Sequence, residues 1–338
     1  MGQIFLTAAN AVLPIVLLIL VGYVLKRKGI VTKEFLKVAN KLVFTLCLSA
    51  TMFINVYSIE SIRDLRWDVI GYCMAMTLII FLLGLGTAMV STRQINRRGV
   101  IVQCIFRSNF AIIGLPLAAA VGGMEAEAVS AVVSAFLVPL FNVLAVVALT
   151  VFDNNEKGSH FRGVLKGIAK NPLILGTVAA FVCILIRQLQ NVVFGSVVFT
   201  IEKQLPFVYK ALSQLKNCTT PLALVVMGGQ FEFSAAKGML KEILVGTVWR
   251  IVLAPLLGVG VAMLLTRYSG FIRFGPNEYP AILALYGSPV AVSSAIMAKQ
   301  MGGDEQLATQ YVVWTSIASV LTIFLLVSAM LAMGLLVV

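Results

Sequence analysis

Ten long apolar runs follow one another along the chain, and they constrain the fold more than any other feature of the sequence. A helix needs about 20 apolar residues to cross the hydrocarbon core of a bilayer, and the runs are close to that length. Only 12% of the residues are charged and 60% are hydrophobic, whereas soluble domains carry about 25% charged residues. The sequence therefore predicts an all-α integral membrane protein with ten transmembrane helices. The predicted spans are 4–25, 35–57, 69–91, 99–121, 128–152, 170–187, 206–231, 241–266, 279–301 and 306–336.

The charges predict how the chain lies in the membrane. Its 338 residues include 26 Lys and Arg against 14 Asp and Glu, a net charge of +12. In a soluble protein this excess would suggest nucleic acid as the partner, but here it lies in short loops between apolar runs. Alternate loops carry thirteen and five cations, and the cation-rich side stays cytoplasmic. We expect a multi-pass protein of the inner or plasma membrane, with both termini outside and lipid rather than nucleic acid around it.

The sequence lacks the residues that metal binding, redox chemistry and catalysis usually require. The five cysteines fall inside apolar runs without a C-x-x-C spacing, and His160, the single histidine, has no second ligand nearby. An intramembrane enzyme would need an Asp pair, an H-E-x-x-H motif or a histidine within a span, and the chain offers none of these. We expect no cofactor, no metal and no catalytic residue.

An internal repeat divides the chain into residues 1–152, a cytoplasmic linker at 153–171, and residues 172–338. At an offset of 173 positions, Gly114 and Pro116 fall on Gly287 and Pro289. Further matches at this offset are Lys37, Leu42, Ala50, Ala111 and Ala118 with Lys210, Leu215, Ala223, Ala284 and Ala291. Five spans per repeat is an odd number, so the second copy must be inserted upside down. The pattern predicts a 5+5 inverted repeat.

The shared Gly-x-Pro motif predicts that helices four and nine are broken and cross each other. A proline within a helix removes a backbone hydrogen bond, and paired interrupted spans in an inverted repeat are typical of a transporter binding site. Pro116 and Pro289 would each open a half-helix, whose free amides and positive dipole end favour an anion. A plain kink is the alternative for either proline alone.

Polar and small residues around these breaks are the candidate substrate-binding residues. Asn109 lies two turns before Pro116 and presents both a donor and an acceptor, although interhelical packing is the alternative. Arg107 and Arg250 lie eight to nine residues into their spans, where they either reach the cytoplasm or draw anions inward. The candidates are Arg107, Asn109, Gly114, Leu115, Pro116, Arg250, Tyr286, Gly287, Ser288, Pro289 and Ser293. Ser294 belongs to the same polar cluster in span nine. Weaker candidates, from spans two and seven, are Asn40, Ser49, Thr51, Asn217, Thr219 and Thr220.

The carboxylates argue against a cationic substrate. All 14 lie in loops or at span ends, although mid-membrane carboxylates are the usual proton relays and cation sites of pumps. A conventional sodium site would have only carbonyl and hydroxyl oxygens as ligands. Lys210, Lys216 and Lys299 lie near span ends, where snorkelling toward the interface is the favoured interpretation.

The segment Arg107-Ser108-Asn109-Phe110-Ala111-Ile112-Ile113-Gly114-Leu115-Pro116-Leu117 resembles the fourth-helix motif of the auxin efflux carrier family, including its bacterial organic-acid and malonate-type members and the plant auxin transporters. Asn171-Pro172, Thr220-Pro221, Trp249-Arg250 and Gly287-Ser288-Pro289 are similar to that family too. The resemblance covers essentially the whole chain. It implies a scaffold of helices 1, 2, 6 and 7, a transport domain of helices 3–5 and 8–10, and an elevator-like movement; a homodimer is plausible from the resemblance alone. Span two lacks the proline that many relatives have, and the linker is short.

The leading hypothesis is a secondary, elevator-type carrier of small organic acid anions such as malate, malonate or auxin-like weak acids. The alternative is a sodium-coupled organic anion symporter of the bile-acid transporter type, which shares a crossed broken-helix plan. A pore-forming channel is a further alternative, and it would differ by conducting without saturation.

Overall fold

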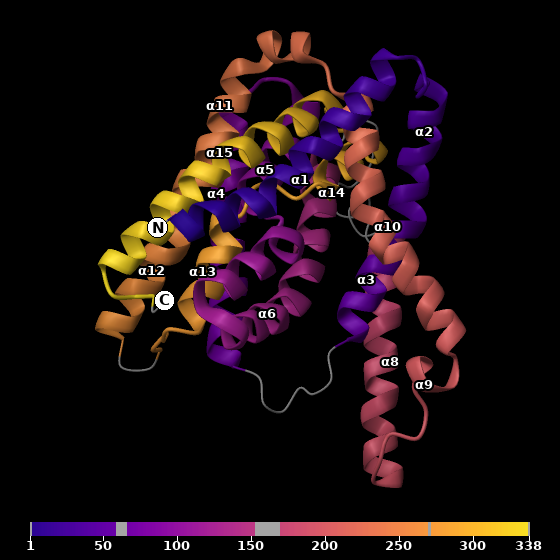
Figure 1. Cartoon of the computed structure of the whole chain (residues 1–338), viewed down its shortest axis with the longest axis vertical. Coiled ribbons are helices and arrows are strands. Elements are labelled where there is room, and N and C mark those ends of the chain that lie inside the picture. The colour runs from indigo at the N-terminus through magenta and orange to yellow at the C-terminus, as the bar shows by residue number, and fades with distance from the viewer. Residues whose placement is uncertain (1, 59–65, 153–169, 270–271, 337–338) are drawn as a thin grey trace.

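The computed structural model describes residues 2–58, 66–152, 170–269 and 272–336, and these residues fold as helices joined by short connections. The first half contains α1 (Gly2–Arg27), α2 (Lys33–Leu42), α3 (Leu48–Tyr57), α4 (Trp67–Ser91), α5 (Ile95–Phe106) and α6 (Leu115–Val151). The second half contains α8 (Pro172–Phe194), α9 (Ile201–Gln204), α10 (Pro206–Gln230), α11 (Leu240–Val248), α12 (Ala254–Tyr268), α13 (Glu278–Gly287), α14 (Ser293–Gln300) and α15 (Glu305–Ala332). The prediction of an all-helical fold is confirmed for these residues (Figure 1).

Wide π-helical turns join several of these helices into longer rods. Such turns occupy Val43–Cys47 between α2 and α3, Phe110–Gly114 before α6, and Trp249–Leu253 between α11 and α12. They leave a continuous helical path while shifting the register of the side chains that follow. A 3₁₀ segment at Phe233–Met239 leads into α11.

Helical segments occupy all ten predicted spans. In the described part of the chain, six helices are long and apolar enough to cross a membrane: Lys33–Tyr57, Trp67–Ser91, Phe110–Val151, Pro172–Phe194, Ala236–Tyr268 and Glu305–Ala332. The predicted fourth and ninth spans are each interrupted, as expected for broken helices. Within α6, Gly123 adopts φ +74°, which separates the end of the predicted fourth span from the fifth. The ten-helix inverted repeat itself stays a prediction, and residues 153–169 of the expected linker lie outside the described residues.

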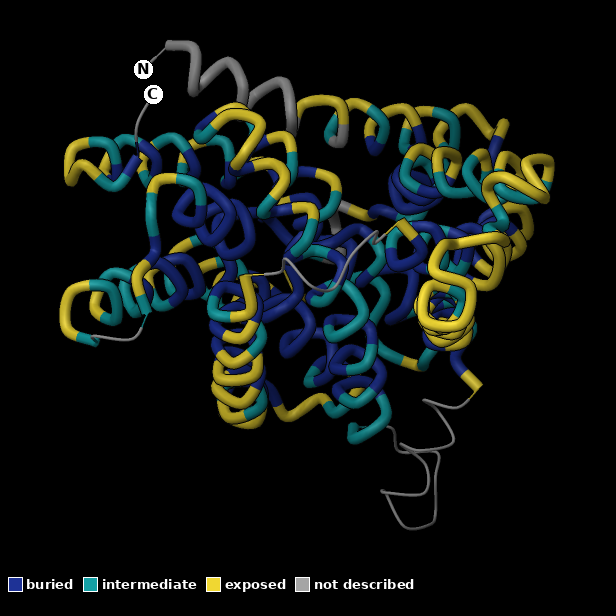
Figure 2. The backbone as a smooth tube through the Cα atoms, turned by 90° about the horizontal axis from the view of Figure 1, so that it is seen from below, coloured by how far each residue is buried: buried dark blue, intermediate teal, exposed yellow. Residues whose placement is uncertain are grey.

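The helices pack as two neighbouring groups that the long α1 joins. α3 packs against α8 and α10, while α5, α6, α12 and α13 pack among themselves around the interrupted spans. α1 lies against both α10 and α15 (Figure 1). Buried turns concentrate in the centre of the molecule and exposed turns on its outer helices (Figure 2). The outer face of α8 is apolar, with Leu175, Val182 and Leu185 each about half exposed, as a lipid-facing surface requires.

Two glycines allow α1 and α10 to cross at van der Waals distance. A Cβ at Gly228 would lie 1.9 Å from the backbone oxygen of Ile19, and one at Gly22 would lie 2.0 Å from that of Val225. Small residues commonly permit this close approach between helices in a membrane. The contact fixes α1 against the group that contains α3, α8 and α10.

We therefore expect Gly228→Ala to lower the midpoint of thermal unfolding of the detergent-solubilised protein, because the added methyl group meets backbone that cannot move aside. Overpacking of this kind costs about 1–3 kcal/mol. Gly86→Ala in α4 is the matched control, since nothing lies within 4 Å of its Cβ position. An equal midpoint in Gly228→Ala and the control would contradict the close crossing.

Candidate functional site

Two extended segments cross at the centre of the molecule, one from each interrupted span. α5 ends at Phe106 and α13 ends at Gly287, and the residues that follow pair in an antiparallel bridge between Ser108 and Val290. Asn109 N–H donates to the carbonyl of Pro289 at 2.7 Å, and Ala291 N–H donates to the carbonyl of Arg107 at 3.2 Å. These bonds satisfy backbone groups that leave their helices inside the protein, which is a requirement at membrane depth.

The first break does not lie where the Gly-x-Pro motif predicts it. The chain unwinds at residues 107–109, seven residues before Pro116, and Pro116 lies in the first turn of α6 after a helical segment that already begins at Phe110. Its missing N–H is tolerated there because the π-helical turn Phe110–Gly114 directly before it already departs from the regular α-helical hydrogen-bond pattern. Pro289, in contrast, lies within the extended segment itself. The expectation that Pro116 and Pro289 each open a half-helix is therefore wrong, because the first begins at Phe110 and α14 begins at Ser293, four residues after Pro289. The two motifs do not occupy equivalent places.

Arg250 binds the ends of both helices that stop at the crossing. Its guanidinium donates to the carbonyls of Ile105 and Phe106 at 3.2 Å each, and to those of Leu285 and Tyr286 at 3.4 and 2.5 Å. The last carbonyls of a helix lack intrahelical partners and carry its negative dipole end. One fully buried cation, 0% exposed, thus neutralises two converging helix C-termini.

The opposite, amide-bearing helix ends lie at a cavity. The helical segment from Phe110 and the helix α14 from Ser293 both begin beside the crossing, and helix N-termini favour negative charge. Two donors nearby have no partner among the described residues: the Nδ2 of Asn109 and the Oγ of Ser108, both on buried side chains. Buried donors of this kind are commonly bonded to a ligand or water.

The cavity has a volume of about 690 Å³ and lies between the crossing, α3, α6 and α10. Among the described residues, its charged lining residues are Arg107 and Lys216, and no Asp or Glu of these residues lines it. The polar lining residues are Thr51, Asn55, Ser58, Ser108, Asn109, Ser134, Asn217, Thr219, Thr220 and Ser293, and the apolar ones include Met52, Phe110, Phe136 and Phe141. The lining is therefore cationic, rich in hydroxyl and amide groups, and bounded by aromatic rings.

Arg107 forms the polar end of this cavity. It is 3% exposed and donates to the Oδ1 of Asn142 at 2.6 Å, the Oε1 of Gln103 at 3.3 Å and the Sδ of Met297 at 2.7 Å. Each of these acceptors is electrically neutral. The guanidinium of this lining residue is thus held by several neutral contacts, and no carboxylate of the described residues lies within 4 Å of it.

The predicted site residues divide into two groups. Arg107, Asn109, Leu115 and Ser293 line the cavity. The others lie outside the lining: Gly114, Pro116, Arg250, Tyr286, Gly287, Ser288 and Pro289. The side chains of two of these bind neighbouring backbone instead, because Tyr286 donates to the carbonyl of Cys73 at 3.0 Å and Ser288 to that of Ala284 at 2.5 Å.

Several lining residues were only weak candidates or were assigned another role. Thr51 and Thr219 share a hydrogen bond of 2.9 Å across α3 and α10, and Thr220 and Asn217 lie beside them. Lys216 lines the cavity, although its place near a span end favoured snorkelling. The signal that points to this face is the group Lys216, Asn217, Thr219 and Thr220 in the middle of a predicted membrane span.

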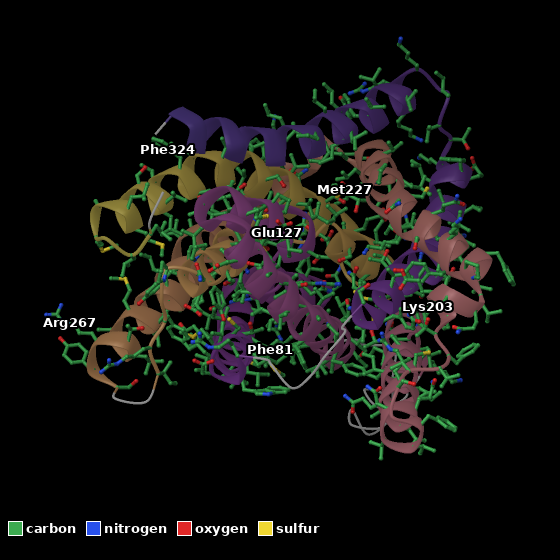
Figure 3. The ribbon with its side chains drawn as sticks, turned by 60° about the horizontal axis from the view of Figure 1, so that its bottom comes forward. Phe81, Glu127, Lys203, Met227, Arg267 and Phe324 are labelled. Atoms are coloured by element: carbon green, nitrogen blue, oxygen red, sulfur yellow. The ribbon has the colours of Figure 1, made fainter. Side chains whose placement is uncertain are left out.

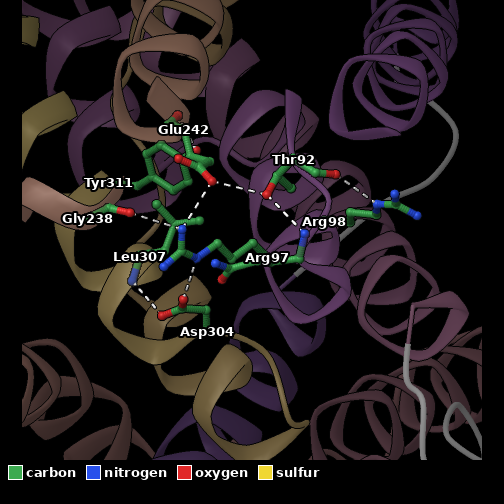
Figure 4. A network of polar contacts seen from close by, with 9 residues as sticks. Thr92, Arg97, Arg98, Gly238, Glu242, Asp304, Leu307 and Tyr311 are labelled. Carbon is green, nitrogen blue, oxygen red and sulfur yellow. Dashed lines mark hydrogen bonds and ion pairs between the residues drawn. The ribbon is translucent and has the colours of Figure 1, made fainter. Parts of the chain in front are cut away.

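Outside the cavity, charged residues lie at helix ends and pair with one another. Arg97 binds Asp304 at 2.9 Å and Glu242 at 3.1 Å, and Glu242 also accepts from Thr92 (Figure 4). Burial lowers the pKa of Arg97, but its hydrogen bonds to Asp304 and Glu242 outweigh that effect and raise the pKa above its usual value. This network ties the start of α5 to α11 and α15.

Two further cations, Arg267 and Lys203, lie at the periphery of the molecule. Arg267, at the end of α12, points away from the body of the molecule, and Lys203 on α9 lies on the opposite flank (Figure 3). Neither lines the cavity. The positive lining of the cavity therefore differs from the ordinary charged surface of the protein.

The fold and the comparisons define the class of protein. Several apolar helices with two breaks that meet at a polar cavity are typical of a membrane transporter. The family model described as "Membrane transport protein" matches residues 7–327. The chain belongs to this family, which is the auxin efflux carrier family. It is also 23% identical, over 253 residues, to an uncharacterized transporter of Methanocaldococcus jannaschii, a match that covers 73% of this chain and 76% of that protein.

We expect Arg250→Gln to lower the yield and thermal stability of the folded protein, because it leaves helix-end carbonyls without a donor. Leaving a buried acceptor without its hydrogen-bond partner costs about 1–3 kcal/mol. Arg250→Lys should restore stability only in part, since an ammonium lacks the planar fork that reaches both helix ends. The readout is the monodisperse fraction after heating in detergent, with Lys216→Gln as the control. A stable Arg250→Gln protein with altered anion preference would contradict this role.

Proposed function

We propose that this protein is a secondary carrier that moves small organic acid anions, such as malate, malonate or auxin-like weak acids, across the cell membrane. The observation that carries the proposal is the chemistry of the cavity. Arg107 and Lys216 line it, no carboxylate of the described part of the chain does, and two helix N-termini begin beside it. A carboxylate is the ligand that guanidinium, ammonium and amide donors bind best.

The size and the lining of the cavity also support a small organic acid as the substrate. A cavity of about 690 Å³ lies within the usual range of ligand sites, about 300–1,000 Å³. Asn109 and Ser108 supply donors that the protein leaves unused, while Phe136 and Phe141 supply apolar surface for the carbon skeleton. The anion would bind with its carboxylate toward the crossing and its apolar part toward α6.

The position of the cavity supports an elevator-type movement. Its walls come from α3 and α10 on one side and from the crossing and α6 on the other. We propose that α1, α2, α3, α8 and α10 form the scaffold, and that the helices around the crossing form the transport domain that carries the anion. In this proposal the halves 1–152 and 172–338 are inverted repeats, both termini lie outside, and two chains assemble as a homodimer.

The sodium-coupled symporter remains the second candidate because it shares a crossed broken-helix plan. Since no carboxylate lines the cavity in the residues that the structure describes, a sodium ion there would depend on carbonyl and hydroxyl oxygens, which are weaker ligands for a cation in a positively charged cavity. Anion uptake into proteoliposomes that is equal with and without an inward sodium gradient supports the first candidate. Uptake that requires the gradient would favour the second.

Purified protein in liposomes should take up labelled malonate or malate with saturation, and Asn109→Ala should raise the half-saturation concentration about tenfold or more. Loss of a hydrogen bond to a charged group costs about 1.5–3 kcal/mol. Ser288→Ala is the matched control, because its hydroxyl binds the carbonyl of Ala284 and does not line the cavity.

The flux experiment has two outcomes that contradict the proposal. Absence of uptake for every mono- and dicarboxylate tested would exclude an organic anion carrier. Flux that rises linearly with concentration would indicate a pore instead. Equal half-saturation in Asn109→Ala and the wild type would remove Asn109 from the binding site.

A further inference from the structure

Arg107 is buried with neutral partners, whereas Arg97 is buried with carboxylate partners. Arg97 binds two carboxylates, those of Glu242 and Asp304. Arg107 is more deeply buried than Arg97, at 3% against 9% exposed. Yet among the described residues no carboxylate lies within 4 Å of Arg107, and its acceptors are two amides and a thioether. A buried charge without a counter-ion is costly, so this arrangement needs a function.

The two amides occupy positions where a carboxylate would fit with the same shape. The Oδ1 of Asn142, on α6, accepts from Arg107 at 2.6 Å, and the Oε1 of Gln103, on α5, accepts at 3.3 Å. An amide oxygen accepts a hydrogen bond as a carboxylate oxygen does, but it carries no net charge. Asp at position 142 or Glu at position 103 would therefore keep the contact and cancel the charge.

The orientation of Asn142 is itself fixed. Its Nδ2 donates to the Sδ of Met52 at 2.7 Å, which turns its oxygen toward Arg107. Met52 also lines the cavity, whereas Asn142 does not. Asn142 thus acts on the cavity through Arg107.

We propose that Arg107 is an uncompensated positive charge of the anion site, an inference that rests on the proposed function. Asn142 and Gln103 are positioning residues, and because both are neutral, the charge of Arg107 stays available to the substrate. The anion completes the ion pair that the protein leaves open. The contribution of Arg107 is then electrostatic as well as geometric, and it exists before any substrate binds.

The test measures the electrostatic potential of the cavity with a thiol and two charged reagents, so it needs no knowledge of the substrate. Val138 lines the cavity four residues before Asn142 in α6, about 6 Å along the helix. In the full-length protein with Cys183→Ser and Cys218→Ser, Val138→Cys provides the thiol. The readout is the ratio of its reaction rates with a negatively and a positively charged methanethiosulfonate at low ionic strength.

We expect the negative reagent to react faster in the parent protein. Arg107→Gln, Asn142→Asp and Gln103→Glu should each lower the rate ratio about fivefold or more, which is the effect of one unit charge near the thiol in a water-filled cavity. Asn142→Leu is the matched control: it removes the hydrogen bond without adding charge and should leave the ratio within about twofold of the parent. Asn191→Asp, on the exposed end of α8, should leave it unchanged.

Two results would overturn the proposal. An unchanged ratio in Arg107→Gln would mean that the guanidinium charge is already compensated. An equal fall in Asn142→Leu and Asn142→Asp would mean that repacking, and not charge, is responsible. If Asn142→Asp does not fold, Gln103→Glu gives the same information from another helix. A positive cavity without carboxylate uptake would contradict the proposed function alone, while uptake with an unchanged ratio would contradict this proposal alone.

Discussion

The structure depends on how two interrupted helices satisfy their backbone groups inside a membrane protein. The unwound segments around Ser108 and Val290 bind each other as a short antiparallel bridge. Arg250 binds the carbonyls of both helices that end there. Within lipid, unsatisfied carbonyls and amides cost several kcal/mol each. The crossing is therefore stable only because a buried cation and a bridge replace the lost helical bonds.

This arrangement separates the two signs of the helix dipoles. The negative ends of α5 and α13 are bound by Arg250, so the positive ends beside the cavity remain free for a ligand. Arg107 adds a full charge at the same place, and neutral partners hold it. Charge that acts in a cavity bounded by protein is less screened than charge at the surface. The helix breaks, which cost backbone hydrogen bonds, thus also place positive helix ends and Arg107 beside the cavity.

The sequence predicted the structural features that depend on a local pattern, but it did not predict contacts between residues that lie far apart in the chain. Apolar runs predicted the helices, and the Gly-x-Pro motif near Pro289 predicted a break that is present. The break near Pro116 lies seven residues earlier, because the π-helical turn Phe110–Gly114 accommodates this proline without interrupting the helix. The contacts of Arg250 join positions about 145 residues apart, so no local pattern reports them. Lys216 was assigned to the interface because hydropathy gives depth and not the direction of a side chain.

The central claim is that an organic anion binds beside the crossing, between Arg107, Asn109 and Ser293. The most direct measurement is an anomalous diffraction map from crystals of the protein grown with bromomalonate, whose bromine marks the position of the bound anion. The account predicts a bromine peak within the cavity, next to these residues, in the wild type and its absence in Arg107→Gln. A peak at another location, or an empty cavity at saturating bromomalonate, would contradict it.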